Sequence, residues 1–323
     1  MALPIYATPL EKAWHWTYKV ICVLIFLFLI APILVIIPLS FNSEPYFTFT
    51  KKMMSLDPEG YSLRWYDLLL TFGMTAPDAI RDSSWWSDVW ANAAWVKAAK
   101  NSIIIGFYST ILATCLGTLA ALGLARPEMP WRRLIMAILI SPMIVPIIIT
   151  ATGMFFFYSS ACVSPDSFLG SMLAPLLSNS GCLANTYLGV IMAHATLGIP
   201  FVIITVTATL ISFDYTLARA AASLGASPQR TFFKIMLPLI LPGVISGALF
   251  AFVTSFDEVV AVLFIAGHDQ QTIPRQMWNG IREQISPAIL SVATILVIFS
   301  IALLATVELL RRRSERLRGV SPG

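Results

Sequence analysis

The sequence is short of charged residues. Only 12% of its 323 residues are Asp, Glu, Lys or Arg, about half of the roughly 25% found in soluble domains, and this argues against a water-soluble enzyme. Four cysteines are too few for a disulfide miniprotein, and the absence of a repeat excludes collagen and coiled coils. The content of hydrophobic residues, 57%, excludes a disordered chain. With a mean hydropathy of +0.78, the composition indicates an integral membrane protein.

Residues that usually carry chemistry are scarce as well. The three histidines, His15, His194 and His268, lie in different segments, and no Cys or His pair has the spacing of metal ligands. The sequence has no G-x4-G-K-S/T phosphate loop and no nucleophile elbow. Asp257 and Glu258 are adjacent, so on a helix they would point apart. We therefore expect no catalytic residue, no metal site and no cofactor bound by this chain. An intramembrane enzyme is a rival interpretation, but the sequence contains no catalytic constellation that would support it.

Six apolar runs are long enough to cross a bilayer, which takes about 20 residues. They cover residues 19–41, 99–124, 134–157, 187–211, 240–266 and 287–310. The first run is too long for a signal peptide and no small-residue cleavage site follows it, so we interpret it as a retained span. Pro142, Pro146 and Pro200 predict kinks in the third and fourth runs. The predicted fold class is an all-α polytopic membrane protein with a transmembrane domain at 19–310.

Basic residues are distributed unevenly between the two sides that these runs define. Thirteen of the twenty-one lie on the side of both termini. They are Lys12, Lys19, Arg126, Arg132, Arg133, Arg219, Arg230, Lys234, Arg311, Arg312, Arg313, Arg316 and Arg318. Because Lys and Arg accumulate on the cytoplasmic side, segment 1–18 and the basic tail 311–323 are predicted to be cytoplasmic. The simplest role for the run of three arginines is an anchor at anionic lipid, and protein docking is the alternative.

Two segments are predicted to lie on the outer side of the membrane. Segment 42–98 contains five of the nine tryptophans, which favours amphipathic helices at the membrane interface; a docking surface for an extracellular partner is a compatible alternative. Loop 158–186 contains Cys162 and Cys182, and an oxidising compartment favours a disulfide between them, although two free thiols remain open. Cys22 and Cys115 lie within spans and are expected to stay unreactive thiols.

The link 212–239 between the fourth and fifth runs contains more structure than a simple connector. Its alanine-rich stretch predicts a short helix over 215–224, and Gly225 would provide a left-handed C-cap. Ser227 and Pro228 would then start a second helix as N-cap and first residue. Leu217, Ala221 and Leu224 fall on one helical face. A helix-turn-helix of this kind, with small residues outward, could seat in a groove on another protein.

This link resembles the EAA loop of ABC-importer permeases, which has the pattern E-A-A-x3-G-x9-I-x-L-P. Ala220, Ala221, Gly225, Ile235, Leu237 and Pro238 match the pattern in register, whereas Arg219 stands where it has Glu. The resemblance implies that these seven residues contact an ATP-hydrolysing subunit. The role of the motif Glu in that contact must therefore be filled in another way in this chain, or by the partner permease.

Other segments resemble the smaller permease of spermidine/putrescine importers. They are Ser62–Tyr66, Asn101-Ser102, Gly117–Ala121, His194, Ile199–Phe201, Ser255–Val259, Thr272–Pro274 and Met277-Trp278. The resemblance covers about residues 15–312. Segments 42–98 and 158–186 depart from it, as does Ile147 after Pro146, where such permeases often have an acid. These departures leave the transport role intact and bear on the choice of substrate.

The resemblance implies one subunit of a type I ABC importer in the bacterial inner membrane. Such an importer has two permeases, here favoured to be a heterodimer, two subunits that bind ATP and Mg, and a periplasmic solute-binding protein. The implied solute is a polyamine; an opine, an amino-acid derivative or an anion are the alternatives. A channel or carrier that works without an ATPase is a further alternative, against which the EAA-like loop argues. Nucleic acid is not an expected partner.

Asp257, Glu258 and His194 are polar residues predicted within spans. An acid at the membrane centre costs about 3 kcal/mol on insertion scales, so such residues usually face a bundle interior or a pathway. At 1.5 Å per residue, Asp257 and His194 would lie about 13 Å and about 10 Å below the outer ends of their spans. We expect one cation-accepting cavity lined by both, with Asp257 rather than Glu258 in the pathway. The alternative is a helix-packing or gating hydrogen bond.

Overall fold

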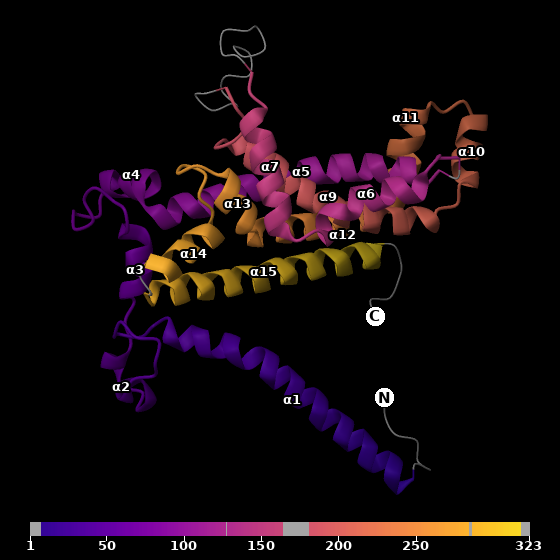
Figure 1. Cartoon of the computed structure of the whole chain (residues 1–323). Helices are drawn as coiled ribbons and strands as arrows, with labels where there is room; N and C mark the ends of the chain where they lie inside the picture. Colours follow the sequence, from indigo (N-terminus) through magenta and orange to yellow (C-terminus); the bar gives the residue numbers. More distant parts are fainter. Residues whose placement is uncertain (1–7, 127, 164–180, 284–285, 318–323) are drawn as a thin grey trace. The chain divides into compact units, whose positions relative to one another are not determined.

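The computed structural model describes residues 8–126, 128–163, 181–283 and 286–317 (Figure 1). The first seven residues, most of the predicted outer loop 158–186 and the end of the basic tail lie outside this part. Helices are the regular elements of the described residues, which also contain two isolated β-bridges. The chain divides into two compact units, one formed by Met1–Val89 with Gly280–Gly323 and one by Trp90–Asn279.

Four helices of the described chain are long and apolar enough to cross a membrane. They are α1 (Pro9–Leu39), α5 (Ala94–Leu124), α9 (Tyr187–Ile211) and the helical run Pro228–Asp257. The predicted sixth run lies in α15 (Ala288–Leu317), where Ala288–Ala302 forms a shorter apolar stretch. Pro200 lies within α9, which stays one helix. The all-α polytopic class predicted from hydropathy is confirmed.

The predicted third run is not one straight span. It forms α6 (Arg132–Ile144) and α7 (Ile147–Ser160), which meet at an angle of 102°. The break lies at Val145 and Pro146. Proline has no backbone N–H, and it forces the preceding residue away from helical angles; Val145 is extended, with φ −69° and ψ 137°. Of the two prolines predicted to kink this run, Pro146 marks the bend and Pro142 lies inside α6.

The predicted fifth run is also divided. Helix α11 (Pro228–Thr231), a π-helical turn η3 (Phe232–Met236) and α12 (Leu237–Asp257) follow one another as one helical run. The run ends at Asp257, because Glu258 is extended (φ −75°, ψ 123°). Helix α13 (Val260–Ile265) then begins. The expectation that one helix continues to residue 266 was therefore wrong.

Small residues bring α5, α9 and α12 close together in the unit Trp90–Asn279, where Figure 1 shows them side by side. A Cβ atom built on Gly247 of α12 would lie 2.5 Å from Thr205 Oγ1, and one on Gly117 of α5 would lie 2.7 Å from Val202 Cβ. Gly198 of α9 faces alanines of both neighbouring helices. Such close approach of backbones is the usual basis of helix packing within membranes.

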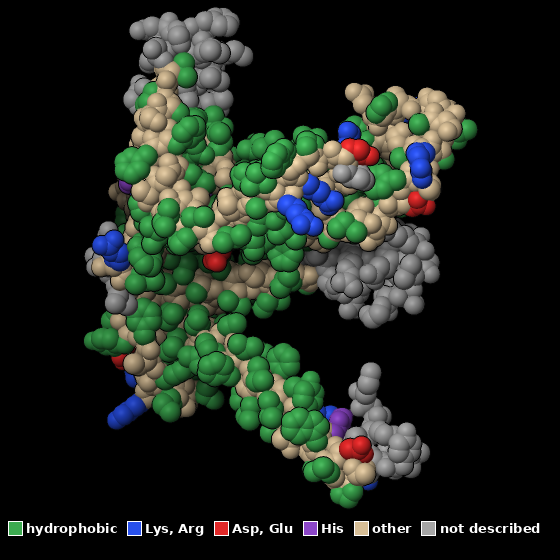
Figure 2. Space-filling model, turned by 45° about the vertical axis from the view of Figure 1, so that its right-hand side comes forward, with side chains coloured by type: hydrophobic (Ala, Val, Ile, Leu, Met, Phe, Trp, Pro, Cys, Tyr) green, Lys and Arg blue, Asp and Glu red, His purple; other side chains and the backbone are tan. Residues whose placement is uncertain are grey.

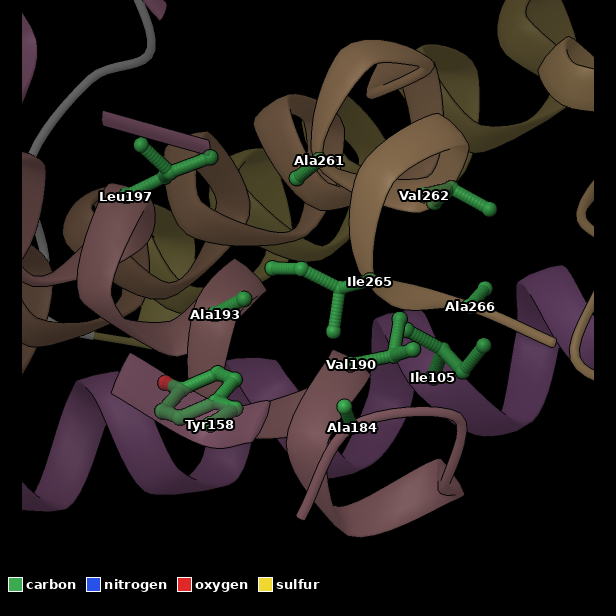
Figure 3. Close-up of a cluster of buried hydrophobic side chains, with 10 residues drawn as sticks. All are labelled: Ile105, Tyr158, Ala184, Val190, Ala193, Leu197, Ala261, Val262, Ile265 and Ala266. Carbon is green, nitrogen blue, oxygen red and sulfur yellow. The ribbon is translucent and has the colours of Figure 1, made fainter. Parts of the chain in front are cut away.

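Helix α13 is packed into the same unit. Figure 3 shows Ile265 of α13 beside Val190 and Ala193 of α9, with Ile105 of α5 and Tyr158 of α7 in the same buried cluster. The cluster therefore joins the short helix after the break to three longer ones.

The other unit contains α1, α3 (Arg64–Thr71) and α15, connected by a buried polar contact. Ser40 Oγ lies 2.8 Å from Tyr66 Oη, and Ser291 Oγ donates to Ser40 O at 3.3 Å. Between α1 and α5 the chain forms short helices, α2 (Lys51–Met54), η1 (Pro58–Gly60), α3 and α4 (Ser83–Asn92).

The tryptophans of segment 42–98 do not all lie on the surface. Trp65 and Trp85 are buried, and their indole N–H groups donate to Asn42 O at 2.7 Å and Pro77 O at 3.3 Å. Trp86 and Trp90 are exposed. The interface prediction therefore fits only part of the set, since two indoles form core contacts.

Candidate functional site

Residues 214–231 form a helix-turn-helix, here called the α10–α11 projection, which connects the end of α9 to the run that contains α12 (Figure 1). Helix α10 (Thr216–Ser223) begins where Asp214 Oδ1 accepts the Thr216 N–H at 2.9 Å. Hydrogen bonds from the side chain and backbone of Thr216 lower the pKa of Asp214. The carboxylate therefore stays ionised at the positive end of the helix, which favours an anion.

The turn has the geometry that its sequence predicts. Gly225 adopts φ +79°, and the Ala226 N–H donates to Ala221 O at 3.0 Å in the manner of a glycine C-cap. Ser227 Oγ accepts the Arg230 N–H at 3.3 Å, and Pro228 is the first residue of α11. The prediction of two helices joined at Gly225 is confirmed.

One side of α10 packs and the other is open. Ala221 is buried, and Ala218 packs against a core cluster that includes Phe213 and Leu210. Arg219 and Ala220 are exposed. The face predicted from Leu217, Ala221 and Leu224 does not pack as one, because α10 ends at Ser223 and Leu224 is 89% exposed at the turn.

The last three motif residues connect the projection to α12. Ile235 lies in η3 and is half-buried, and Leu237 packs on the same core cluster as Ala218. Pro238 has no N–H to donate to the carbonyl four residues earlier, which accounts for a widened helical turn at this place. Figure 2 shows Lys and Arg side chains at this end of the unit, with Asp or Glu side chains among them.

A buried hydrogen-bonded contact connects the three packed helices. His194 Nδ1 of α9 lies 2.8 Å from Ser255 Oγ of α12, and Ser109 Oγ of α5 donates to Ser255 Oγ at 2.9 Å. His194 is 1% exposed, and its Nε2 has no hydrogen-bond partner among the described residues. The geometry is that of a helix-packing hydrogen bond, the alternative considered for this histidine.

The two adjacent acids have different environments. Asp257 is the last residue of α12 and is exposed, whereas Glu258 is buried and its Oε1 accepts the Ala261 N–H at 2.9 Å. This bond satisfies a free N–H at the start of α13 and explains why a new helix begins there.

Asp257 and His194 do not share one side of α12. His194 bonds Ser255, which precedes Asp257 by two residues and hence lies about 200° around the helix axis from it. The described contacts therefore do not bring the two side chains together on one face of α12.

Sequence reasoning missed a group of residues that holds the chain after α13. Asn101 Nδ2 donates to Asp269 O at 2.7 Å and to Gln271 O at 2.9 Å, and Ser102 Oγ accepts the Ile273 N–H at 2.9 Å. Arg275, in α14 (Ile273–Glu283), donates through Nη1 to three carbonyl groups. These are Val262 O, Ala266 O and Gly267 O. The signal available in the sequence was Asn101, a polar residue near the start of the apolar run 99–124.

Cys162 and Cys182 form a disulfide in the structure. The bond joins the chain just after α7 to the chain just before α9. The residues 164–180 between them lie outside the described part.

Sequence comparison finds relatives of this chain among importer components. The model of the family described as binding-protein-dependent transport system inner membrane component matches residues 113–317. The spermidine/putrescine transport system permease protein PotC of Haemophilus influenzae is 27% identical over 291 residues, 90% of this chain and 95% of that protein. The putrescine transport system permease protein PotI of Escherichia coli K12 is 28% identical over 308 residues, 93% of each chain. The sulfate transport system permease protein CysT of Salmonella typhimurium is 28% identical over 263 residues, 80% of this chain and 92% of that protein.

Solved structures show the same fold. A bacterial ABC transporter involved in the import of the acidic polysaccharide alginate matches with a TM-score of 0.59 at 15% identity, covering 96% of this chain and 99% of that one. The family match spans the α10–α11 projection, the packed helices α9 and α12 and the break after Asp257. This chain therefore belongs to the family of binding-protein-dependent transport system inner membrane components, as a permease subunit of an ABC importer that is not itself an enzyme.

Proposed function

We propose that this permease imports a small cation of the polyamine class. The observation that carries the proposal is the exposed carboxylate of Asp257 at the C-terminal end of α12. The neighbouring Glu258 is buried, and its carboxylate already accepts the Ala261 N–H. The C-terminal end of a helix carries partial negative charge, which favours a cation there. Broken helices in other transporters use such ends to coordinate cations near the bilayer centre.

The exposed face of α12 suits the same substrate. Phe250, Val253 and Asp257 follow one another at spacings of three and four residues, so they lie on one face, and all three are exposed. Phe250 stacks on Phe201 of α9 with ring centroids 6.0 Å apart. An ammonium group that loses its water needs carboxylates or aromatic faces in exchange, and this face offers both.

The relatives support the substrate class in part. Spermidine/putrescine and putrescine permeases match over about nine tenths of the chain, while a sulfate permease matches over 80% of it. An anion is therefore the second candidate. A single carboxylate at the end of α12 favours the cation, because it would repel sulfate.

The proposal includes an orientation and a set of partners. Both termini and the α10–α11 projection face the cytoplasm, where the basic residues gather. Residues 219–238 dock on one of two subunits that bind ATP and Mg, and a second permease, a different chain, completes the pathway. A periplasmic binding protein delivers the solute; a solved alginate transporter is in complex with such a protein.

The test is uptake of labelled putrescine and spermidine into membrane vesicles that contain ATP and are supplied with the binding protein. Asp257→Asn keeps the shape and removes the charge, so we expect uptake to fall at least tenfold, about 1.4 kcal/mol. Glu258→Gln is the matched control, since its amide oxygen can still accept the Ala261 N–H, and we expect near-normal uptake. Wild-type rates in Asp257→Asn, or uptake of sulfate instead of polyamine by the unmodified chain, would contradict the proposal.

A further inference from the structure

The α10–α11 projection and the turn that follows it are basic. Arg219, Arg230 and Lys234 are exposed here, and Asp214 is the one acid, since none occurs between it and Asp257. The Asp214 carboxylate is already hydrogen-bonded at the start of α10. The surface therefore presents an excess of positive charge.

Arg219 is the long polar side chain on the open side of α10. Ala218 and Ala221 turn toward the core, while Ala220, Ala222 and Ser223 are exposed and short. The ion pairs of the described residues are Lys52–Glu59 and Arg81–Asp67, and Arg219 belongs to neither. Its charge acts on Asp214, whose pKa it helps to lower, but the exposed guanidinium forms no ion pair in the described residues and can meet another molecule. Small neighbours allow that molecule to approach the helix backbone.

We propose that the nucleotide-binding subunit presents an acidic side chain to Arg219. The resulting ion pair, with the positive charge on the permease and the negative charge on its partner, selects the subunit that fits this permease. The inference rests on the proposed docking of the projection on that subunit. A guanidinium placed in a protein groove without a counter-charge would lose its hydration uncompensated. A carboxylate can pair with it through two parallel hydrogen bonds, which lysine cannot reproduce.

The chemistry of the surface favours a protein groove over a lipid surface. Helices that lie in a membrane interface carry large apolar residues such as Trp, Phe and Leu on the buried face. Helix α10 and its turn expose Leu217 and Leu224, but the exposed residues next to Arg219 are alanines and a serine. The turn at Gly225 has a defined capped geometry, which suits a shaped pocket.

The experiment uses the complex purified in detergent through a tag on this chain, with the nucleotide-binding subunit that accompanies the wild type. We expect Arg219→Glu to reduce retention of that subunit at least tenfold, Arg219→Gln to reduce it less, and wild-type retention to fall with rising salt because ion pairs are screened. Arg133→Glu, an exposed change at the start of α6 outside the projection, is the control and should retain the subunit.

Suppressor selection then identifies the partner residue. Changes in the nucleotide-binding subunit that restore transport to Arg219→Glu should replace an acid by Lys or Arg. Normal retention and normal substrate-stimulated ATP hydrolysis in Arg219→Glu would overturn the inference, as would a defect confined to binding of anionic vesicles. If the wild-type chain retains no nucleotide-binding subunit at all, the proposed function fails instead, so the two failures are distinguishable.

Discussion

Gly225 occupies a backbone conformation that most residues avoid, with φ +79° between α10 and α11. A β-branched side chain in the left-handed region costs about 1–2 kcal/mol or more. We expect Gly225→Val to abolish transport while the subunit still inserts in the membrane, because the docking geometry of the projection would be lost. Substrate-stimulated ATP hydrolysis in reconstituted membranes is the measurement.

The control for this prediction is Gly225→Asn. Asparagine enters the left-handed region more readily than other non-glycine residues, and a Cβ at position 225 meets no atom within 4 Å. Stimulated hydrolysis should therefore remain near normal in the Asn variant. Full stimulation in Gly225→Val would show that the turn has no part in coupling.

For single residues, the sequence predicted the conformation of the turn at Gly225 but not the environments of the two adjacent acids. Gly225, Ser227 and Pro228 act through their own backbone or the nearest N–H groups, so local sequence was sufficient to place them. The environments of Asp257 and Glu258 depend on where α12 ends. A neighbouring pair of acids in an apolar run does not reveal that Glu258 would bond the Ala261 N–H and start another helix.

At the scale of elements, the ends of α7 and α9 are connected through Cys162 and Cys182. Closing a loop of about 20 residues constrains the unfolded chain by roughly 3 kcal/mol in the entropy model. We expect mass spectrometry of a non-reduced digest to show the two peptides linked, and Cys22 and Cys115 alkylated in the same sample. Recovery of both loop peptides as separate alkylated species would refute the bridge in the membrane protein.

Hydropathy predicted where helices occur but not how two of them break. The position of the α6–α7 bend could be read at Pro146, since proline removes a hydrogen bond. Its angle of 102° could not, because α7 packs against α13 and α9 through residues such as Tyr158. Those contacts join segments far apart in the sequence, which a local pattern does not contain.

At the scale of the molecule, the packing of α5, α9 and α12 depends on small residues. A Cβ at position 247 would lie 2.5 Å from Thr205 Oγ1 and 2.8 Å from Val202 Cα, and backbone atoms cannot move aside as a flexible side chain can. We expect Gly247→Leu to force α12 away from α9 and to lower the yield of folded protein several-fold. Size-exclusion profiles and thermal unfolding in detergent are the measurements.

A matched substitution separates packing from hydrophobicity. A Cβ at Gly153 of α7 meets nothing within 4 Å, so Gly153→Leu adds the same side chain where the unit has room. Equal loss of folded protein in both variants would mean that close helix approach at Gly247 is not what matters.

The run Pro228–Asp257 is helical over 30 residues, about 45 Å along its axis at 1.5 Å per residue. One end begins at the projection, and the other carries the Asp257 carboxylate. Beyond it, Arg275 and Asn101 hold the following segment by its carbonyl groups, so the extended residue Glu258 is the pivot. A helix of that length acts as a lever about this pivot: a tilt of about 5° displaces its other end, at the projection, by about 4 Å, while the Asp257 carboxylate beside the pivot stays nearly in place.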